Sequence, residues 1–225
     1  MSLARIEDRG DRLVVVNANT RRRGALSPDL YTAITQACAT AREDRIRAVV
    51  LTSEAGFFCS GGDLTLLQER RSLPETERRN RVEALHDVIR ALRTCPVPVI
   101  AAIEGGAAGA GVSLALACDL TVSGENAHFT AAYVKAGLVP DGGLTAALAR
   151  LVPRSVAMEL CLLGQPISAQ RLFALGALTR TVAEGTAFDV ALALADAICA
   201  GPPHAQTTIK GLVNAAYNAT EAAQM

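Results

Sequence analysis

The sequence predicts an α/β fold with a largely parallel central sheet and a helical C-terminal region. Over the first 130 residues, short apolar runs alternate with helical stretches, and strands joined through helices pair in parallel. From about residue 142 the pattern changes to helices punctuated by glycine and proline. Half of the 225 residues are hydrophobic, which is enough for a sizeable core.

The first elements are two strands with a helix between them. Residues 13–16 and 47–52 are apolar runs typical of buried strands. Ser27-Pro28-Asp29 predicts a helix start, because serine is a good N-cap and proline fits the first helical position. These three elements form the first unit of the predicted parallel sheet.

The later elements follow in order: a charged helix from Pro74 towards Arg93, a strand at 99–103, a helix at 112–117, a strand at 119–122 and a helix capped by Ser168. Pro96 and Pro98 end the charged helix, because proline lacks the N–H that a helix interior needs. The strand at 99–103 is separated from the next helix by a glycine-rich segment, which carries most of the functional information.

This glycine-rich segment has the order of strand, glycines and helix that is typical of a dinucleotide-binding turn. Gly106, Gly109 and Gly111 lie between a strand and a helix, where small residues let a phosphate approach the backbone. Such a turn usually opens its domain, however, and Glu125, the candidate ribose-binding acid, lies in an ordinary turn. A P-loop is excluded because no Gly-Lys-Ser/Thr follows.

Two further interpretations use the same segment. A serine hydrolase with Ser113, His128 and Asp141 lacks the second glycine of a G-x-S-x-G elbow. An oxyanion site needs two backbone N–H groups that converge on one oxygen from loops of small residues. A second glycine loop at 57–64, directly after the strand at 47–52, provides the required partner.

Both loops carry longer motifs. Residues 48–52 and 58–64 read AVVLT and FCSGGDL, and the second loop is set in PVIAAIEG at 98–105, GAG at 109–111 and ACDL at 117–120. These motifs resemble the two oxyanion loops of the enoyl-CoA hydratase/isomerase (crotonase) superfamily. Further similar segments are 127–129, 137–143, 163–169 and 175–178. The resemblance runs in order through nearly the whole chain.

The resemblance implies a spiral ββα fold. Residues 1–190 would form the crotonase-like α/β core with the CoA-thioester site, and residues 191–225 the start of a C-terminal helical region that is truncated here. It also implies small-molecule acyl-CoA substrates, with coenzyme A as part of the thioester and no separate cofactor. The implied assembly is a homotrimer or a dimer of trimers.

The resemblance also assigns site residues by position. The N–H groups of Gly62 and Ala110 would form the oxyanion hole, and the helix that begins near Ala110 would add its dipole. Residues expected to bind the substrate or CoA are Ser60, Asp63, Leu64, Gly109 and Arg22. Arg22 belongs to a basic run at 21–23, for which a solvated turn is the alternative interpretation.

The acid–base residues depart from the family pattern. Where hydratases carry two glutamates that share a water, this sequence has Ser113 and Tyr133, and neither is a carboxylate base near neutral pH. Asp141 matches the aspartate of isomerase-type members, for which a single base suffices. The structural alternatives are Asp141 as the cap of a helix near Gly142, Tyr133 as an apolar wall and Ser113 as a first-turn residue bonded to backbone.

The expected function is an acyl-CoA thioester enzyme of the hydratase/isomerase type that acts through an oxyanion-stabilised enolate. The catalytic candidates are Asp141, Tyr133 and Ser113, and isomerase-like use of Asp141 is favoured because both hydratase glutamates are absent. The alternatives are a non-catalytic or weakly active acyl-CoA-binding homologue and a CoA-thioester hydrolase or decarboxylase.

Composition argues against several other classes. The 22 basic and 22 acidic residues cancel and only 4% of residues are aromatic, which argues against nucleic-acid binding. No apolar run approaches the roughly 20 residues of a membrane span. Six scattered cysteines and three scattered histidines predict free thiols and no metal site. We expect a cytoplasmic protein, because free thiols persist there and no signal peptide is visible.

Overall fold

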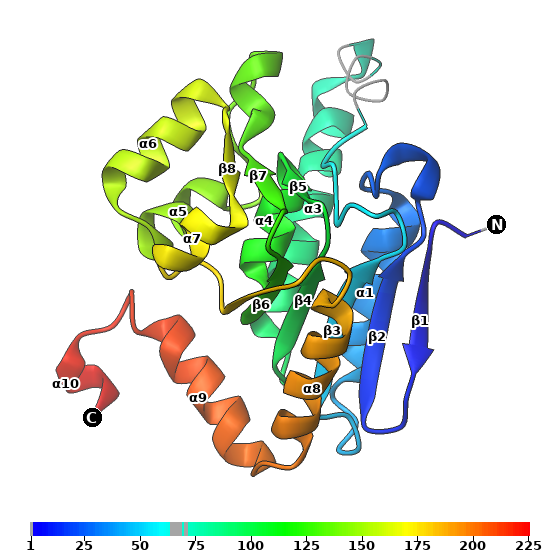
Figure 1. Cartoon of the computed structure of the whole chain (residues 1–225), viewed down its shortest axis with the longest axis vertical. Coiled ribbons are helices and arrows are strands. Elements are labelled where there is room, and N and C mark those ends of the chain that lie inside the picture. Colours follow the sequence, from blue (N-terminus) through cyan, green and yellow to red (C-terminus); the bar gives the residue numbers. More distant parts are fainter. Residues whose placement is uncertain (1, 64–68, 70–71) are drawn as a thin grey trace.

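A parallel sheet forms the centre of the molecule. The computed structural model describes residues 2–63, 69 and 72–225. In this part of the chain, six strands pair in the order β1-β2-β3-β4-β6-β9, of which Figure 1 labels β1 to β4 and β6. Their bounds are β1 Ala4–Asp8, β2 Arg12–Asn17, β3 Ala48–Ser53, β4 Val99–Ile103, β6 Leu120–Gly124 and β9 Arg180–Val182. The pair β1–β2 is antiparallel and the other neighbouring pairs are parallel, which confirms the predicted α/β class.

The helices cover both faces of this sheet. Their bounds are η1 Thr20–Arg22, α1 Pro28–Thr40, α3 Glu75–Thr94, α4 Ala110–Ala117, η3 Ala132–Ala136, α5 Leu144–Leu151, α6 Arg154–Leu163, α7 Ala169–Ala174, α8 Ala187–Cys199, α9 Pro203–Ala215 and α10 Glu221–Gln224. Side-chain alternation along β2 separates two cores. Leu13 and Val15 pack in the core of α1 and α3, whereas Val14 and Val16 pack against α8.

The predicted strands and helix starts are confirmed with small shifts at their ends. The runs at 13–16, 47–52, 99–103 and 119–122 correspond to β2, β3, β4 and β6. The Ser27 hydroxyl accepts the Leu30 N–H at 3.2 Å, and the Ser168 hydroxyl accepts the Arg171 N–H at the same distance. Both serines are therefore N-caps, as the sequence indicates.

A second, smaller sheet was not predicted. It pairs β5 (Gly106–Ala108) with β7 (His128–Thr130) in parallel, and β7 with β8 (Pro166–Ser168) antiparallel. Each strand has three residues, which is too short for an alternating pattern to stand out in the sequence. Strand β5 follows β4 in the chain and leads into α4, so the small sheet positions the glycine-rich segment.

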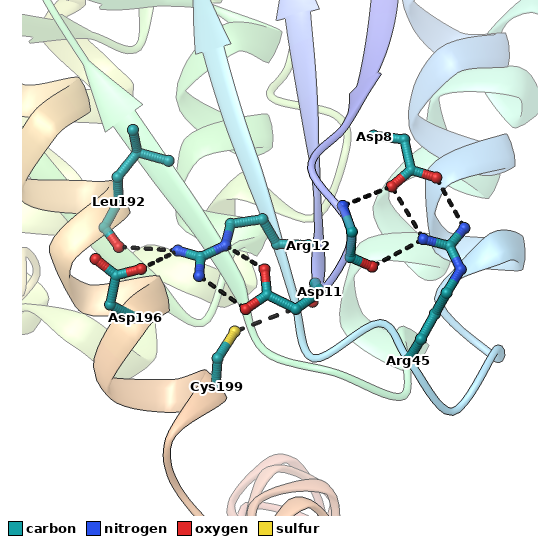
Figure 2. Close-up of polar contacts among 8 residues, drawn as sticks. Asp8, Asp11, Arg12, Arg45, Leu192, Asp196 and Cys199 are labelled. Atoms are coloured by element: carbon teal, nitrogen blue, oxygen red, sulfur yellow. Dashed lines mark hydrogen bonds and ion pairs between the residues drawn. The ribbon is translucent and has the colours of Figure 1, made fainter.

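Polar contacts fasten the hairpin of β1 and β2 to its surroundings (Figure 2). The Arg12 guanidinium binds Asp11 at 2.7 Å and reaches α8, where it contacts Asp196 at 2.6 Å and the Leu192 carbonyl at 3.3 Å. Arg45 binds Asp8 on the other side at 2.8 Å. This cluster lies at the end of the sheet where β2 begins. The glycine-rich loops that follow β3 and β4 emerge from the opposite end.

Helix α9, the helix before α10, has no buried residue and is held to the rest of the fold by polar side chains. The Lys210 ammonium donates to the Leu92 and Val97 carbonyls at 3.1 and 3.0 Å and pairs with Asp119 at 2.7 Å. Burial raises the pKa of Asp119, and Lys210 opposes that rise. The division expected at residue 190 stays a prediction, and that position falls within α8.

Candidate active site

Two glycine loops meet at the carboxyl ends of β3 and β4. A parallel bridge joins Cys59 of the first loop to Ala107 of β5, and the Ala108 N–H donates to the Cys59 carbonyl at 2.9 Å. The bridge places the residues that follow each partner, Gly62 and Ala110, on one wall of the same cavity. The carboxyl ends of parallel strands are where α/β proteins generally bind ligands.

Close approach of these loops requires glycine at two positions. A Cβ on Gly61 would lie 2.6 Å from the Ala108 carbonyl oxygen, and Gly61 also has a left-handed φ of +83°. A Cβ on Gly111 would lie 2.2 Å from the Cys59 carbonyl oxygen. Both distances are too short for a real contact, so the two glycines allow the backbones to touch.

Gly62 and Ala110 present backbone donors to the cavity. Ala110 is the first residue of α4, so no carbonyl one turn earlier in the helix accepts its N–H. Within the described part of the chain, neither N–H donates to a carbonyl or side chain elsewhere in the fold. The positive end of the α4 dipole adds to the potential here. The two predicted oxyanion donors therefore lie together, while their role stays a prediction.

The cavity has a volume of about 510 Å³, within the range of sites that bind small molecules. Much of its wall is apolar and comes from the start of α1 and the residues before it, from α3 and from the segment around η3, namely Leu26, Pro28, Val82, Leu85, Ala132 and Leu138. The carboxylates among the described lining residues are Asp63 and Asp141. Asp63 pairs with Arg22 at 2.5 Å, whereas Asp141 forms no ion pair with the described residues of this wall.

Asp141 is held in a network of hydroxyl groups. The Tyr133 hydroxyl donates to Asp141 Oδ1 at 2.8 Å. The Ser113 hydroxyl donates to the Asp141 backbone carbonyl at 3.1 Å and lies 3.3 Å from the Tyr133 oxygen. Three elements far apart in the sequence thus supply one cluster: α4, η3 and the turn before α5.

The structural alternative for Asp141 is wrong. Helix α5 begins at Leu144 with Gly143 as its N-cap, and no side chain caps it. The Asp141 carboxylate binds Tyr133 instead, because the turn directs it towards η3 rather than along α5. The alternatives for the other two residues are partly correct. Tyr133 is buried but its hydroxyl is a donor, and Ser113 bonds a backbone carbonyl, that of Asp141.

Burial raises the pKa of the Tyr133 phenol, and the negative charge of Asp141 raises it further. A phenol ionises near 10 even in water. Tyr133 is therefore neutral throughout the physiological range and acts as a permanent hydrogen-bond donor. It cannot act as a base there.

The remaining predicted binding residues lie at the same cavity. Ser60, Asp63 and Gly109 line it, and the Ser60 hydroxyl donates to the Arg22 carbonyl at 3.0 Å. Arg22 is half exposed at the rim through its pair with Asp63. The prediction for Leu64 lies outside the described residues.

The serine-hydrolase triad, an alternative interpretation of the sequence, is not assembled. The ring of His128 is exposed and its Nδ1 lies 2.9 Å from the Asn126 carbonyl, so it is not directed to Ser113 as a triad would require. No group of three or more His, Cys, Asp or Glu side chains in the described part could hold a metal ion. Nor is any described helix long and apolar enough to cross a membrane.

Sequence reasoning missed two polar residues of the cavity wall, Tyr31 on α1 and Arg81 on α3. Arg81 also pairs with Glu77, one turn earlier in α3, at 2.8 Å. The sequence did carry a signal that one face of α3 turns inward, because the apolar residues Leu85 and Ile89 are four positions apart and lie on the buried face of the helix. Val82, one turn before Leu85, extends that face to the cavity.

The fold and cavity define an α/β protein with a backbone-donor site at the carboxyl ends of its strands. Residues 9–225 match the family model described as enoyl-CoA hydratase/isomerase. This chain belongs to the enoyl-CoA hydratase/isomerase family, whose members act on acyl-CoA substrates and share the crotonase fold.

Individual relatives agree with this assignment. A "probable enoyl-CoA hydratase" of Mycobacterium avium (strain 104) is 36% identical over 202 residues, covering 89% of this chain and 77% of the relative. The 1,2-epoxyphenylacetyl-CoA isomerase of Escherichia coli (strain K12) is 36% identical over 180 residues, covering 80% and 69%. The crystal structure of an enoyl-CoA hydratase from Polaromonas sp. JS666 superposes with a TM-score of 0.95 at 42% identity, covering 98% and 86%.

Proposed function

We propose that this protein isomerises an unsaturated acyl-CoA thioester by moving a proton with a single base, Asp141. The observation that carries the proposal is the arrangement of the cavity wall. Asp141 lines the same cavity as Gly62 and Ala110, and the other described carboxylate there, Asp63, is paired with Arg22. A carboxylate that forms no ion pair with the described residues therefore lies in the same cavity as two backbone donors.

The backbone donors would stabilise the charge that develops on the thioester oxygen. Removal of a proton next to a thioester carbonyl produces an enolate, and fixed N–H groups bind that oxygen more strongly as its charge grows. Loss of one such donor costs about 2.7–4 kcal/mol of transition-state stabilisation in a well-studied case. The start of α4 adds its dipole at the same place.

Asp141 would complete the reaction alone. The carboxylate takes a proton from C2 of a 3-enoyl thioester, and the electron pair of that C–H bond delocalises to the thioester oxygen and C4. The same carboxyl group then returns the proton to C4, and a 2-enoyl thioester leaves. Proton and charge balance, so no further acid, metal or cofactor is required. The name of the E. coli relative, 1,2-epoxyphenylacetyl-CoA isomerase, supports isomerase chemistry on an acyl-CoA thioester.

The walls support an acyl-CoA ligand with an apolar acyl group. Leu26, Val82, Leu85 and Leu138 would contact the acyl chain, since they line the cavity. We assign the CoA moiety to the rim at Arg22, where a guanidinium favours phosphate. Coenzyme A enters as part of the substrate.

The experiment compares two substrates. The purified protein is assayed with a 3-enoyl-CoA and with crotonyl-CoA, and again as Asp141→Asn. We expect turnover of the 3-enoyl-CoA, and a loss of about 10²- to 10⁴-fold in kcat for the variant, the range of general acid–base contributions. Hydration of crotonyl-CoA that survives Asp141→Asn would refute the role of Asp141. Binding of acyl-CoA with no turnover of either substrate would favour a binding protein instead.

A further inference from the structure

Asp141 is held at two separate points. Its backbone carbonyl accepts the Ser113 hydroxyl at 3.1 Å, and its carboxylate accepts the Tyr133 hydroxyl at 2.8 Å. The next residue, Gly142, has a left-handed φ of +57°, and a Cβ there would lie 2.9 Å from the Ser113 Cβ. The turn therefore rests directly on Ser113, so the main chain and the side chain of Asp141 are fixed independently.

The two carboxylate oxygens of Asp141 differ in their hydrogen bonds. Tyr133 is neutral, because burial and the charge of Asp141 raise its pKa, so its single proton is always available to Oδ1. Within the described residues, no hydrogen bond is made to Oδ2. Oδ1 is occupied by the phenol and Oδ2 remains as the proton acceptor.

Taking the proposed function as given, we propose that Tyr133 is a positioning residue that fixes Asp141 so that Oδ2 alone exchanges the proton with the substrate. The phenol keeps the carboxylate plane in one orientation, and the same oxygen serves both the removal and the return of the proton. Ser113 supports the arrangement because its hydroxyl donates to the Asp141 backbone carbonyl. The two hydroxyl groups act through Asp141 and do not touch the reacting carbons.

This role predicts a defined pattern of kinetic losses. A displacement of about 1 Å in a catalytic group costs roughly 10²-fold in rate. Tyr133→Phe keeps the ring in its buried site and removes only the donor, so kcat should fall about 10- to 100-fold with KM changed less than about twofold. Ser113→Ala should have a smaller effect in the same direction, since the carboxylate would keep its phenol.

The test is a double-mutant cycle on the full chain, assayed with a 3-enoyl-CoA. If Tyr133 acts through Asp141, Tyr133→Phe should lower kcat in the wild-type background and change it less than about twofold in the Asp141→Asn background. The matched control is Tyr217→Phe, which removes the hydroxyl of an exposed tyrosine outside the cavity. Urea unfolding of each variant reports whether the fold is intact.

The outcomes separate this inference from the function on which it rests. Full activity of Asp141→Asn would overturn the proposed function itself. An inactive Asp141→Asn with an unaffected Tyr133→Phe would overturn only the positioning role. Equal losses from Tyr133→Phe in both backgrounds would also overturn it, because the phenol would then support the cavity in general rather than the carboxylate.

Discussion

Substitution of Gly111 by alanine tests how closely the two loops must touch. Gly111 lies in helix α4 without a left-handed φ, so alanine is compatible with its backbone and the effect is steric. Its Cβ would meet the Cys59 carbonyl oxygen at 2.2 Å, whereas an ordinary contact begins at 3.4 Å. One of the two loops must therefore move by about 1 Å.

The displacement would separate the two backbone donors. Gly62 follows Cys59 by three residues and Ala110 precedes Gly111, so one donor moves with each loop. We expect a loss of about 10²-fold in kcat/KM, the size that a 1 Å misplacement or a lost oxyanion donor produces. Stability should fall by about 1–3 kcal/mol through overpacking, partly offset by up to about 1 kcal/mol of helix propensity.

The measurements are kcat/KM with a 3-enoyl-CoA and urea unfolding followed by circular dichroism. Gly211→Ala is the matched control, because Gly211 lies in α9, is exposed and has no heavy atom within 4 Å of an added Cβ. It should leave activity unchanged and stability equal or slightly higher. A Gly111→Ala variant with wild-type activity and stability would refute the reasoning that close loop contact sets the donor geometry.

Two further predictions concern stability. Lys210→Met should lower the free energy of unfolding by about 1–3 kcal/mol, because it removes the donor from the Leu92 and Val97 carbonyls and the cation from the partly exposed Asp119. Urea unfolding measures this loss, and Lys135→Met is the control at an exposed lysine. Equal losses of stability in the two variants would contradict the prediction. Arg45 holds the pKa of Asp8 below its usual value in the folded state, so this contribution is present above about pH 4 and is lost as pH falls through the lower folded value. The urea midpoint should therefore drop on acidification towards pH 3 and drop less steeply in Arg45→Gln, and a slope unchanged by Arg45→Gln would argue against this contribution.

Local sequence signals were sufficient for most of the central fold. A run such as residues 99–103 has apolar side chains on both faces, and β4 is buried throughout, so a parallel strand between helices follows from composition alone. Ser27 caps α1 through groups three residues apart, and such short-range chemistry is visible in any sequence. β1 was missed because it is an edge strand in which exposed charged residues interrupt the apolar pattern.

The sequence also named candidate site residues, but it could not decide how they lie relative to one another. Gly62, Ala110 and Asp141 could be named because the motifs around them resemble a known family and because enolate chemistry requires donors and a base. The sequence could not decide between Asp141 as a cap and Asp141 as a site residue. That choice depends on where α5 begins and on which group faces the carboxylate.

What the sequence by itself determined is the order of β2, β3, β4 and β6 with the helices between them, the serine caps and the chemical candidates. The strands and caps depend on residues a few positions apart. Only the tertiary structure decided that the Tyr133 hydroxyl donates to the Asp141 carboxylate and that the Ser113 hydroxyl donates to the Asp141 backbone carbonyl. It also decided that Gly111 must be glycine, since the carbonyl of Cys59, 52 positions away, occupies the space of a Cβ. Such contacts join residues from different elements, so they are fixed by packing and not by local preference.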